Sequence, residues 1–313
     1  MVEIDIISYK GFFFFCVGEE SIAMHKRKGF TLVELLVVIA IIALLLSILM
    51  PALGRVRQQS LAASCQVRLH QWALIFKMYT EDNNGFFHQE FEAKSTGWVP
   101  AYRPYYQPGM KAGGNPNEGK EQRKIRLCPA ATKFWWDEAH NFTGNKFKAN
   151  AAWGIFSGKT DDEGAWWAYK GDCGSFGLNG WVCNEGPEAD EWWDEVDNLW
   201  RTPMVKGSAN VPLFADCRWV DGWPRDTDEP PAYEGQIADD NWYITQAMKQ
   251  FCTNRHDGNV QMLFMDSSVR KVGLKELWTL KWHRWFNTCG PWTRCGGVQY
   301  DDWPEWMRSF KEY

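Results

Sequence analysis

The stretch KRKGFTLVELLVVIAIIALLLSILMP, residues 26–51, decides how the rest of the chain is interpreted. Its apolar part covers residues 30–50. A helix of that length spans roughly 30 Å at ~1.5 Å per residue, which matches the hydrocarbon core of a bilayer. Lys26, Arg27 and Lys28 directly precede it. We therefore expect a single membrane crossing, with the N-terminus in the cytoplasm and the remaining chain exported.

Glu34 is the one charged residue inside this apolar run. An ionised side chain in the hydrocarbon core costs at least ~2.5 kcal/mol on insertion scales and usually marks a partner or a function. The residues alone leave two interpretations open. Either the side chain lies near the interface and extends toward water, or a cation from another group neutralises it. No small-residue cleavage site follows the run, so the segment should persist rather than be removed as a secretory signal peptide.

The residues around this charge follow a specific order: a basic leader, Gly29, then Phe-Thr-Leu-x-Glu opening an apolar helix. This order resembles the N-terminal signal of type IV prepilins and of type II secretion pseudopilins. The resemblance implies that prepilin peptidase cleaves between Gly29 and Phe30 and that Phe30 is N-methylated. It also implies that Glu34 aligns the subunit with a neighbour, whose Phe30 amine supplies the cation. Pro51 lies where many pilins carry a helix-kinking proline.

The same resemblance implies a structural subunit and not an enzyme. It predicts a single-pass protein of the bacterial inner membrane, with its C-terminal domain periplasmic or at the cell surface. Its partners would be prepilin peptidase and other pilin or pseudopilin subunits, in a homopolymer or a heteropolymer, and no cofactor is expected. A net charge of −5 without a basic face or a nucleic-acid motif argues against nucleic-acid binding.

Residues 1–29 form a leader that is longer than such leaders usually are. A start at Met24 would leave MHKRKG, which is an ordinary short leader. We therefore expect residues 1–23 to be an extension of the gene model, with a genuinely long leader as the alternative. In either case this segment is excluded from the analysis of the fold.

Beyond the apolar run, residues 51–85 predict an amphipathic continuation of the helix that ends at the turn-favouring EDNNG. Residues 30–80 would then form a helix about 75 Å long at ~1.5 Å per residue, which suits an assembly spine. One apolar stripe, with steps of three, four or seven residues, is expected to face the globular domain. It consists of Leu53, Val56, Ala63, Val67, Leu74 and Met78.

Residues 86–313 are expected to form the exported globular domain of an α+β fold, in which the long kinked N-terminal helix packs on an antiparallel sheet. Clusters of Gly, Pro and Asn predict that residues 86–210 are a loop-rich, tryptophan-rich insertion. Residues 211–286 carry the regular elements. These are strands at Val211–Cys217 and Asn259–Met265, a hairpin partner at Val269–Val272 and a late amphipathic helix at Leu274–Phe286.

A second resemblance begins at Arg255, where RHDGNVQMLFMDSSVRKV is similar to the C-terminal signature of a large pseudopilin-like family, His, nine residues, then Asp-Gly. His256 and Asp266 match, but Ser267 stands where Gly is expected, and Ser tolerates a positive φ poorly. No nucleophile motif accompanies the His and Asp. We therefore expect a structural bond from His256 to Asp266 or to the backbone across the turn.

Nine cysteines, of which Cys16 lies in the leader, leave eight in the mature chain. An even number in an exported domain favours disulfides, and the absence of a Cys-x-x-Cys pair argues against a zinc site. The pseudopilin-like family often has a Cys on the spine helix and a later Cys-Pro, matched here by Cys65 and Cys128. Several free buried thiols are the alternative. The pairs we expect are Cys65 with Cys128, Cys173 with Cys183, and Cys289 with Cys295.

Twenty tryptophans are expected to lie mostly in the core. Trp192 and Trp193 have acidic neighbours, which suggests solvent exposure and leaves glycan or partner binding open as a hypothesis. The alternative function is thus a membrane-anchored surface-binding protein with a tryptophan-rich, carbohydrate-binding domain.

TDDEG at 160–164 and ADDN at 238–241 offer oxygen ligands for calcium. Neither follows EF-hand spacing, so we expect solvated loops and claim no metal site.

Overall fold

The computed structural model describes residues 30–89, 97–107, 124–131, 133–134, 136–137, 141–142, 150–154, 172–185, 195–236 and 246–313. These residues divide into two compact units. The first ends at Leu53, and the second runs from Gly54 to Tyr313. Each unit is described by itself below.

The first unit consists of the N-terminal part of helix α1 (Leu32–Asp82), which contains Pro51 in its interior. The large apolar side chains between Phe30 and Met50 are 44% to 85% exposed. By its length and composition this is a helix that can cross a membrane. An apolar surface of this extent is unfavourable in water, so lipid or other protein must cover it.

In the second unit, α1 buries a different face from the one expected. Cys65, Leu69, Trp72, Phe76 and Thr80 follow one another at steps of four and three residues and are all buried. The expected stripe is wrong, because its members lie exposed, with Val56, Val67, Leu74 and Met78 at 58%, 57%, 63% and 41%. The face with the large aromatic rings of Trp72 and Phe76 buries more apolar area than the expected stripe would. The free energy gained by burial increases with the apolar area buried.

The main sheet has five strands in the order β10-β9-β7-β6-β8. Neighbouring strands are antiparallel except for β6 and β8, which are parallel. The expected strands and the hairpin are present, with Val269 opposite Leu263. The α+β prediction is confirmed. The bounds are β6 (Phe176–Asn179), β7 (Pro212–Asp216), β8 (Asp221–Gly222), β9 (Asn259–Phe264) and β10 (Val269–Gly273).

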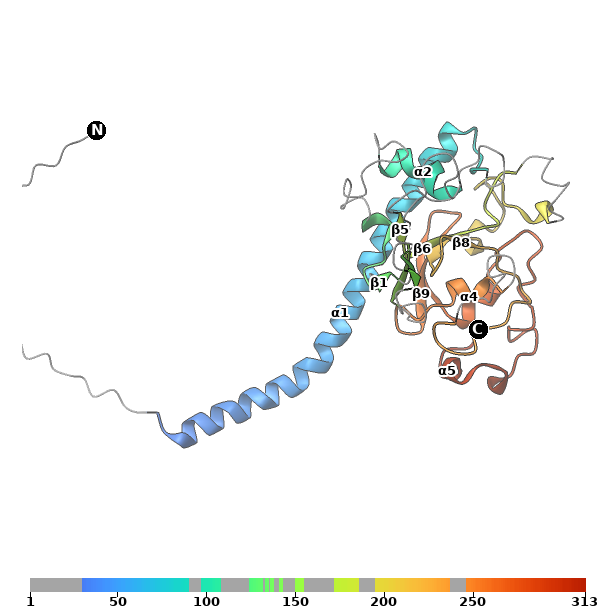
Figure 1. The fold of residues 1–313 in the computed structure, drawn as a ribbon. Helices are drawn as coiled ribbons and strands as arrows, with labels where there is room; N and C mark the ends of the chain where they lie inside the picture. Colours follow the sequence, from blue (N-terminus) through green and yellow to red (C-terminus); the bar gives the residue numbers. More distant parts are fainter. Residues whose placement is uncertain are drawn as a thin grey trace, which may run out of the picture. The chain divides into compact units, whose positions relative to one another are not determined.

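The second half of α1 lies against the sheet (Figure 1), and aromatic side chains make the contact. The ring of Phe214 on β7 lies 4.9 Å from that of Trp72 and 5.6 Å from that of Phe76. Trp98, at the start of helix α2 (Trp98–Tyr106), completes the group at 5.5 Å from Trp72. Side chains two residues apart on a strand share a face, so Asp216 points to the same side of β7 as Phe214.

The segment expected to be an insertion contributes β6 to the interior of the main sheet. It also contributes two smaller sheets, one with the order β1-β4-β5 and one that pairs β2 with β3. Strands of four or two residues, some of them with a glycine, carry too little alternation to be recognised from sequence. The bounds are β1 (Lys133–Phe134), β2 (Trp136–Asp137), β3 (Asn141–Phe142), β4 (Ala151–Gly154) and β5 (Cys173–Gly174).

The expected helix over Leu274–Phe286 is wrong, since the chain forms only the 3₁₀ helix η5 (Lys275–Thr279). Leu280 is extended (φ −88°, ψ 154°). The Leu277 carbonyl accepts the Leu280 amide and the indole N–H of Trp282, while the Lys281 amide, its α-helical partner, donates to the Asn210 carbonyl. Short helices complete the described elements. They are η1 (Lys124–Arg126), η3 (Val196–Asn198), η4 (Ser208–Asn210), α4 (Met248–Phe251), η6 (Tyr300–Asp302) and α5 (Glu305–Arg308).

Most of the described tryptophans lie in the core, and many of them donate their indole N–H to a backbone carbonyl. The acceptors are in irregular segments as well as strands. Trp72 bonds Ile125, Trp98 bonds Val220, Trp153 bonds Phe176, Trp181 bonds Pro224, Trp200 bonds Trp282 and Trp278 bonds Asp228. Some of these carbonyls, such as those of Pro224 and Asp228, lie outside the strands and helices, whereas the Val220 carbonyl also accepts the Leu178 amide. Trp285, at 72% exposed, is a clear exception.

The hairpin between β9 and β10 adopts the conformation that the signature's Gly would favour, although Ser267 occupies the position. Ser267 has φ +69°. The Asp266 carboxylate holds the turn by accepting bonds from the Ser268 amide (2.9 Å) and hydroxyl (2.6 Å). A left-handed conformation costs a non-glycine residue about 1–2 kcal/mol.

We predict that Ser267→Gly stabilises the protein by about 0.5–1 kcal/mol, because relief of the left-handed strain exceeds the extra chain entropy of glycine. The measurement is urea unfolding of the mature chain in detergent. Ser268→Gly is the control. That residue lacks a positive φ and its hydroxyl bonds Asp266, so this change should destabilise. An unchanged or lower stability of Ser267→Gly would contradict the explanation.

Candidate assembly site and a buried polar cluster

Thr31 and Glu34 form a reciprocal pair of bonds at the start of α1. The Thr31 amide and hydroxyl donate to Glu34 Oε2 at 2.8 and 2.9 Å. The Glu34 amide donates to Thr31 Oγ1 at 3.2 Å. This is a capping box, in which the residue before the helix and the third helical residue satisfy each other's free amides. The spacing Thr-x-x-Glu before an apolar run was available in the sequence but was not used there.

Glu34 therefore has a first role that needs no second chain. Its carboxylate lies beside the positive end of the helix dipole, where a negative charge is favourable. Oε2 takes both bonds from Thr31, and within the described part of the chain Oε1 accepts none. One oxygen is held in place while the other remains available to a cation.

A buried group of four side chains lies between α1 and the sheet. Cys65 comes from α1, Cys128 follows η1, Asp216 ends β7 and His256 precedes β9, and their ligand atoms all lie within 4.8 Å of one another. His256 Nε2 is 3.2 Å from both Cys128 Sγ and Asp216 Oδ2. Cys65 Sγ lies 3.9 Å from each Asp216 oxygen. Four segments far apart in sequence thus converge on one point, which we call the Cys-His-Asp cluster.

Arg255 supports the cluster from one side. Its Nη1 lies 3.2 Å from Asp216 Oδ1 and also donates to the Ser175 carbonyl. Its Nη2 donates to the carbonyls of Ala151 (2.6 Å) and Cys217 (2.7 Å). The guanidinium both neutralises a buried carboxylate and joins β4, the segment before β6 and the end of β7.

The charges of the cluster are mutually stabilised. Burial would raise the pKa of Asp216, but His256 and Arg255 lower it to about 2. Burial would lower the pKa of His256, but Asp216 and Cys128 raise it to about 10. Burial would raise the pKa of Cys128, but hydrogen bonds from Cys65 and His256 lower it to about 7. Opposite charges held within hydrogen-bonding distance account for these directions.

This arrangement lacks the geometry of a catalytic triad. In such a triad the two ring nitrogens of the His face different partners, which lets the imidazole pass a proton. Here Nε2 alone faces both Cys128 and Asp216. The thiols of Cys65 and Cys128 are also fully buried, so a substrate has no access to them.

Comparisons with known proteins agree with the N-terminal geometry. Residues 24–50 match the prokaryotic N-terminal methylation motif. Over 63 residues the chain is 41% identical to the type IV wide pilus major component PilA4 of Thermus thermophilus. In its N-terminal segment the chain is type IV pilin-like. The alignment covers 20% of this chain and about half, 48%, of that relative. No solved structure matches the chain.

The signature residues of this pilin-like chain do not bond each other. His256 pairs with Cys128 and Asp216, whereas Asp266 lies exposed in the hairpin turn. The expected bond between His256 and Asp266 is not formed, because β9 separates them and six strand residues span roughly 20 Å. Sequence reasoning missed Asp216. A carboxylate two residues after Phe214, ending an otherwise apolar strand, was the available signal.

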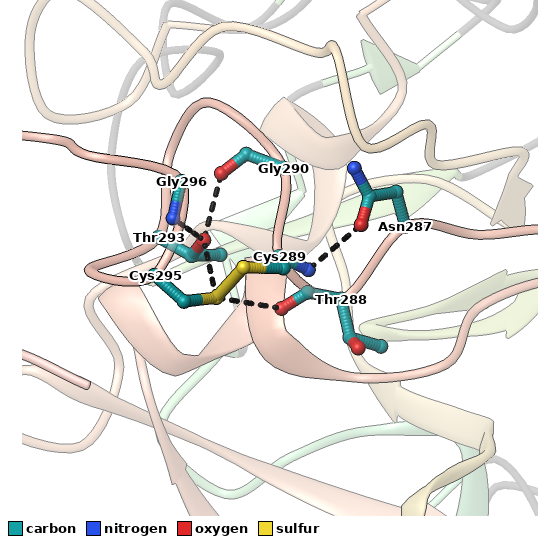
Figure 2. Close-up of a disulfide and its surroundings, with 7 residues drawn as sticks. All are labelled: Asn287, Thr288, Cys289, Gly290, Thr293, Cys295 and Gly296. Atoms are coloured by element: carbon teal, nitrogen blue, oxygen red, sulfur yellow. Dashed lines mark hydrogen bonds between the residues drawn. A yellow bond between two sulfur atoms is a disulfide. The ribbon is translucent and has the colours of Figure 1, made fainter.

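The expected disulfides have different outcomes. Cys289 and Cys295 form a disulfide, and Figure 2 shows Thr293 beside it, its hydroxyl bonding the Gly290 carbonyl. The expected Cys65–Cys128 pair consists of adjacent thiols that are not linked by a disulfide.

Cys173 and Cys183 are also buried thiols and do not form the expected disulfide. Cys173 lies opposite Gly154 in the pairing of β5 with β4, while Cys183 lies beyond β6 and bonds the Gly180 carbonyl at 3.5 Å.

Several predicted sites fall outside the described residues. These are Gly29, the candidate ligand-contact residues Trp192 and Trp193, and the calcium-candidate strings at 160–164 and 238–241. Phe30 is described and is 68% exposed, and Pro51 lies inside α1.

We predict that Arg255→Lys destabilises the protein by about 2–4 kcal/mol, although the charge is kept. Lysine has one nitrogen and cannot reach all four acceptors at once, so buried carbonyls lose their donors. Urea unfolding of the mature chain in detergent measures the loss. The matched control is Arg57→Lys on the exposed face of α1, which should change stability by less than about 0.5 kcal/mol. Equal stability of both variants would contradict the role assigned to Arg255.

Proposed function

We propose that the mature chain is a structural subunit that assembles through α1 into a type II secretion-type or type IV pilus-like filament. Prepilin peptidase cleaves the precursor between Gly29 and Phe30, and the new N-terminus is N-methylated. Before assembly the subunit crosses the inner membrane once, with its C-terminal domain on the periplasmic side or at the cell surface. Its partners are further copies or other pilin and pseudopilin subunits.

This proposal rests on the observation that, within the described residues, only one oxygen of the Glu34 carboxylate has a hydrogen-bond partner. Thr31 holds Oε2, and Oε1 has no partner in the described residues. An unneutralised carboxylate at the end of a membrane-length helix is costly, and a cation from outside the chain removes that cost. Cleavage after Gly29 creates a suitable cation, the amine of Phe30, on every subunit. A neighbouring copy displaced along the helix axis can present that amine to Oε1.

The exposed apolar residues of α1 support the same proposal. In the second unit Val56, Val67 and Leu74 stay exposed on the helix although the domain has a large core. Side chains of this kind on one helix face usually mark contact with other protein. Packing against the α1 helices of neighbouring subunits would cover them.

Processing is tested by mass spectrometry of the N-terminal peptide after expression with the cognate prepilin peptidase. We expect a peptide that begins with N-methyl-Phe30. A catalytically inactive peptidase is the control and should leave the peptide that contains Gly29-Phe30 intact. An intact leader with the active peptidase, or a cut beyond Met50, would overturn the proposed processing.

Assembly is tested with three variants at the capping box. Glu34→Gln keeps an acceptor for Thr31 but removes the charge. Thr31→Val removes the hydroxyl but keeps the charge. Because a lost buried ion pair costs several kcal/mol, we expect Glu34→Gln and Glu34→Ala each to reduce recovery in purified filaments by about tenfold or more. Thr31→Val should stay within about fivefold of the parent, since a cap contributes only ~1 kcal/mol.

The results for these variants distinguish filament assembly from the alternative function of a membrane-anchored surface-binding protein. Normal incorporation of Glu34→Gln together with failure of Glu34→Ala would mean that capping, not charge, is what assembly needs. If all three variants reach the cell surface normally and the parent forms no filament, the chain is a membrane-anchored surface-binding protein instead. The processed N-terminus serves as a control, because all three variants should carry N-methyl-Phe30.

A further inference from the structure

We propose that the Cys-His-Asp cluster is a structural Zn²⁺ site in which Cys65, Cys128, Asp216 and His256 are the four ligands. The ion would join α1 to the sheet and to the segment after η1. This inference is independent of filament assembly.

The donors match zinc in type, number and spacing. Structural zinc sites are four-coordinate and use Cys sulfur, His nitrogen and carboxylate oxygen. With Zn–S of about 2.3 Å and Zn–N or Zn–O of about 2.1 Å, neighbouring donors of a tetrahedron lie roughly 3.3–3.8 Å apart. The cluster has separations of 3.2, 3.2 and 3.9 Å, with the remaining ones no longer than 4.8 Å. Shifts of side chains alone can close the site.

The position of His256 favours an ion between the donors over a set of separate hydrogen bonds. A ring nitrogen carries either one hydrogen or one lone pair. His256 Nε2 nevertheless faces Cys128 Sγ and Asp216 Oδ2 at the same distance of 3.2 Å. One hydrogen cannot point well at both acceptors, whereas one lone pair directed at an ion among the three atoms satisfies the geometry.

A carboxylate that binds a metal is normally oriented by other hydrogen bonds. The carboxylate of Asp216 is oriented in this way. Arg255 Nη1 donates to Oδ1 at 3.2 Å, and the Gln261 amide donates to Oδ2 at 2.8 Å. A carboxylate has about four acceptor positions, so these bonds fix its orientation and still leave one on each oxygen for the ion.

The charges balance in the metal-bound state. Two thiolates and the Asp216 carboxylate carry three negative charges, and Zn²⁺ with the Arg255 guanidinium carries three positive ones when His256 is neutral. A buried site without net charge avoids the large cost of an unpaired buried ion. Binding requires only that the thiols release their protons, with no oxidant or reductant.

A disulfide between Cys65 and Cys128 is the competing outcome, because the same two sulfurs are adjacent. A disulfide, however, needs only those sulfurs and gives no reason for a His and an Asp to converge on them. The scattered origin of the ligands also explains why no Cys-x-x-Cys pair marks the site. The four residues belong to four separate segments, and with no position left open the site would be structural rather than catalytic.

The test begins with the metal content of the full mature chain, purified in detergent without chelator and measured by inductively coupled plasma mass spectrometry. We expect about one zinc per chain. Exchange for Co²⁺ should give the intense visible absorption of a tetrahedral site together with thiolate charge-transfer bands. Cys65→Ala should lose the metal, whereas Cys252→Ala, which removes another buried thiol outside the cluster, should keep it.

Two results would overturn the proposal. One is a protein without metal whose Cys65 and Cys128 are linked in non-reducing peptide mapping. The other is a folded protein with neither metal nor disulfide that also fails to bind added Zn²⁺ or Co²⁺ after reduction. If Cys65→Ala fails to fold, the cobalt spectrum of the parent chain decides, because thiolate charge-transfer bands require sulfur ligands.

Discussion

The contact between the second half of α1 and β7 is the constraint on which the rest of the domain depends. Phe214 and Asp216 share one face of β7, and Trp72 and Cys65 meet them from the helix. The aromatic half of this contact buries large apolar area, and the polar half satisfies groups that would be costly if left alone. Together the aromatic and polar contacts fix how α1 is turned about its own axis, because a rotation that breaks the aromatic contacts also breaks the polar ones.

A domain with so few strand residues needs another way to satisfy its backbone, and tryptophan provides it. The buried indoles fill large core volumes, and several of them donate their N–H to a carbonyl outside the regular ladders. Trp181 and Trp278 donate to the carbonyls of Pro224 and Asp228, which lie in irregular segments. Arg255 does the same with several donors at once. Among the described tryptophans, backbone hydrogen bonding and core packing account for many of the positions.

The sequence allowed accurate prediction where one strong pattern acted alone. The membrane-length helix, the strand around Phe214 and the hairpin after Asn259 each follow from local periodicity and turn residues. The prediction failed where tertiary contacts determine which residues are buried or paired. Several faces of α1 are apolar enough to be buried, and only the sheet selects Trp72 over Leu74. β6 is too short and too rich in glycine to be recognised, and Asp216 gains its partners only when four distant segments meet.

Glu34 and Asp216 show two solutions to one problem, a carboxylate in a place that disfavours charge. Groups of the same chain, namely Arg255, His256 and the Gln261 amide, surround both oxygens of Asp216. The chain completes the environment of Glu34 only in part, because Thr31 occupies one oxygen and the described residues leave the other open. A carboxylate surrounded by donors of its own chain stabilises the fold of one subunit. A carboxylate held rigidly but left half-satisfied gains most from a second chain, which is the property that an assembly contact requires.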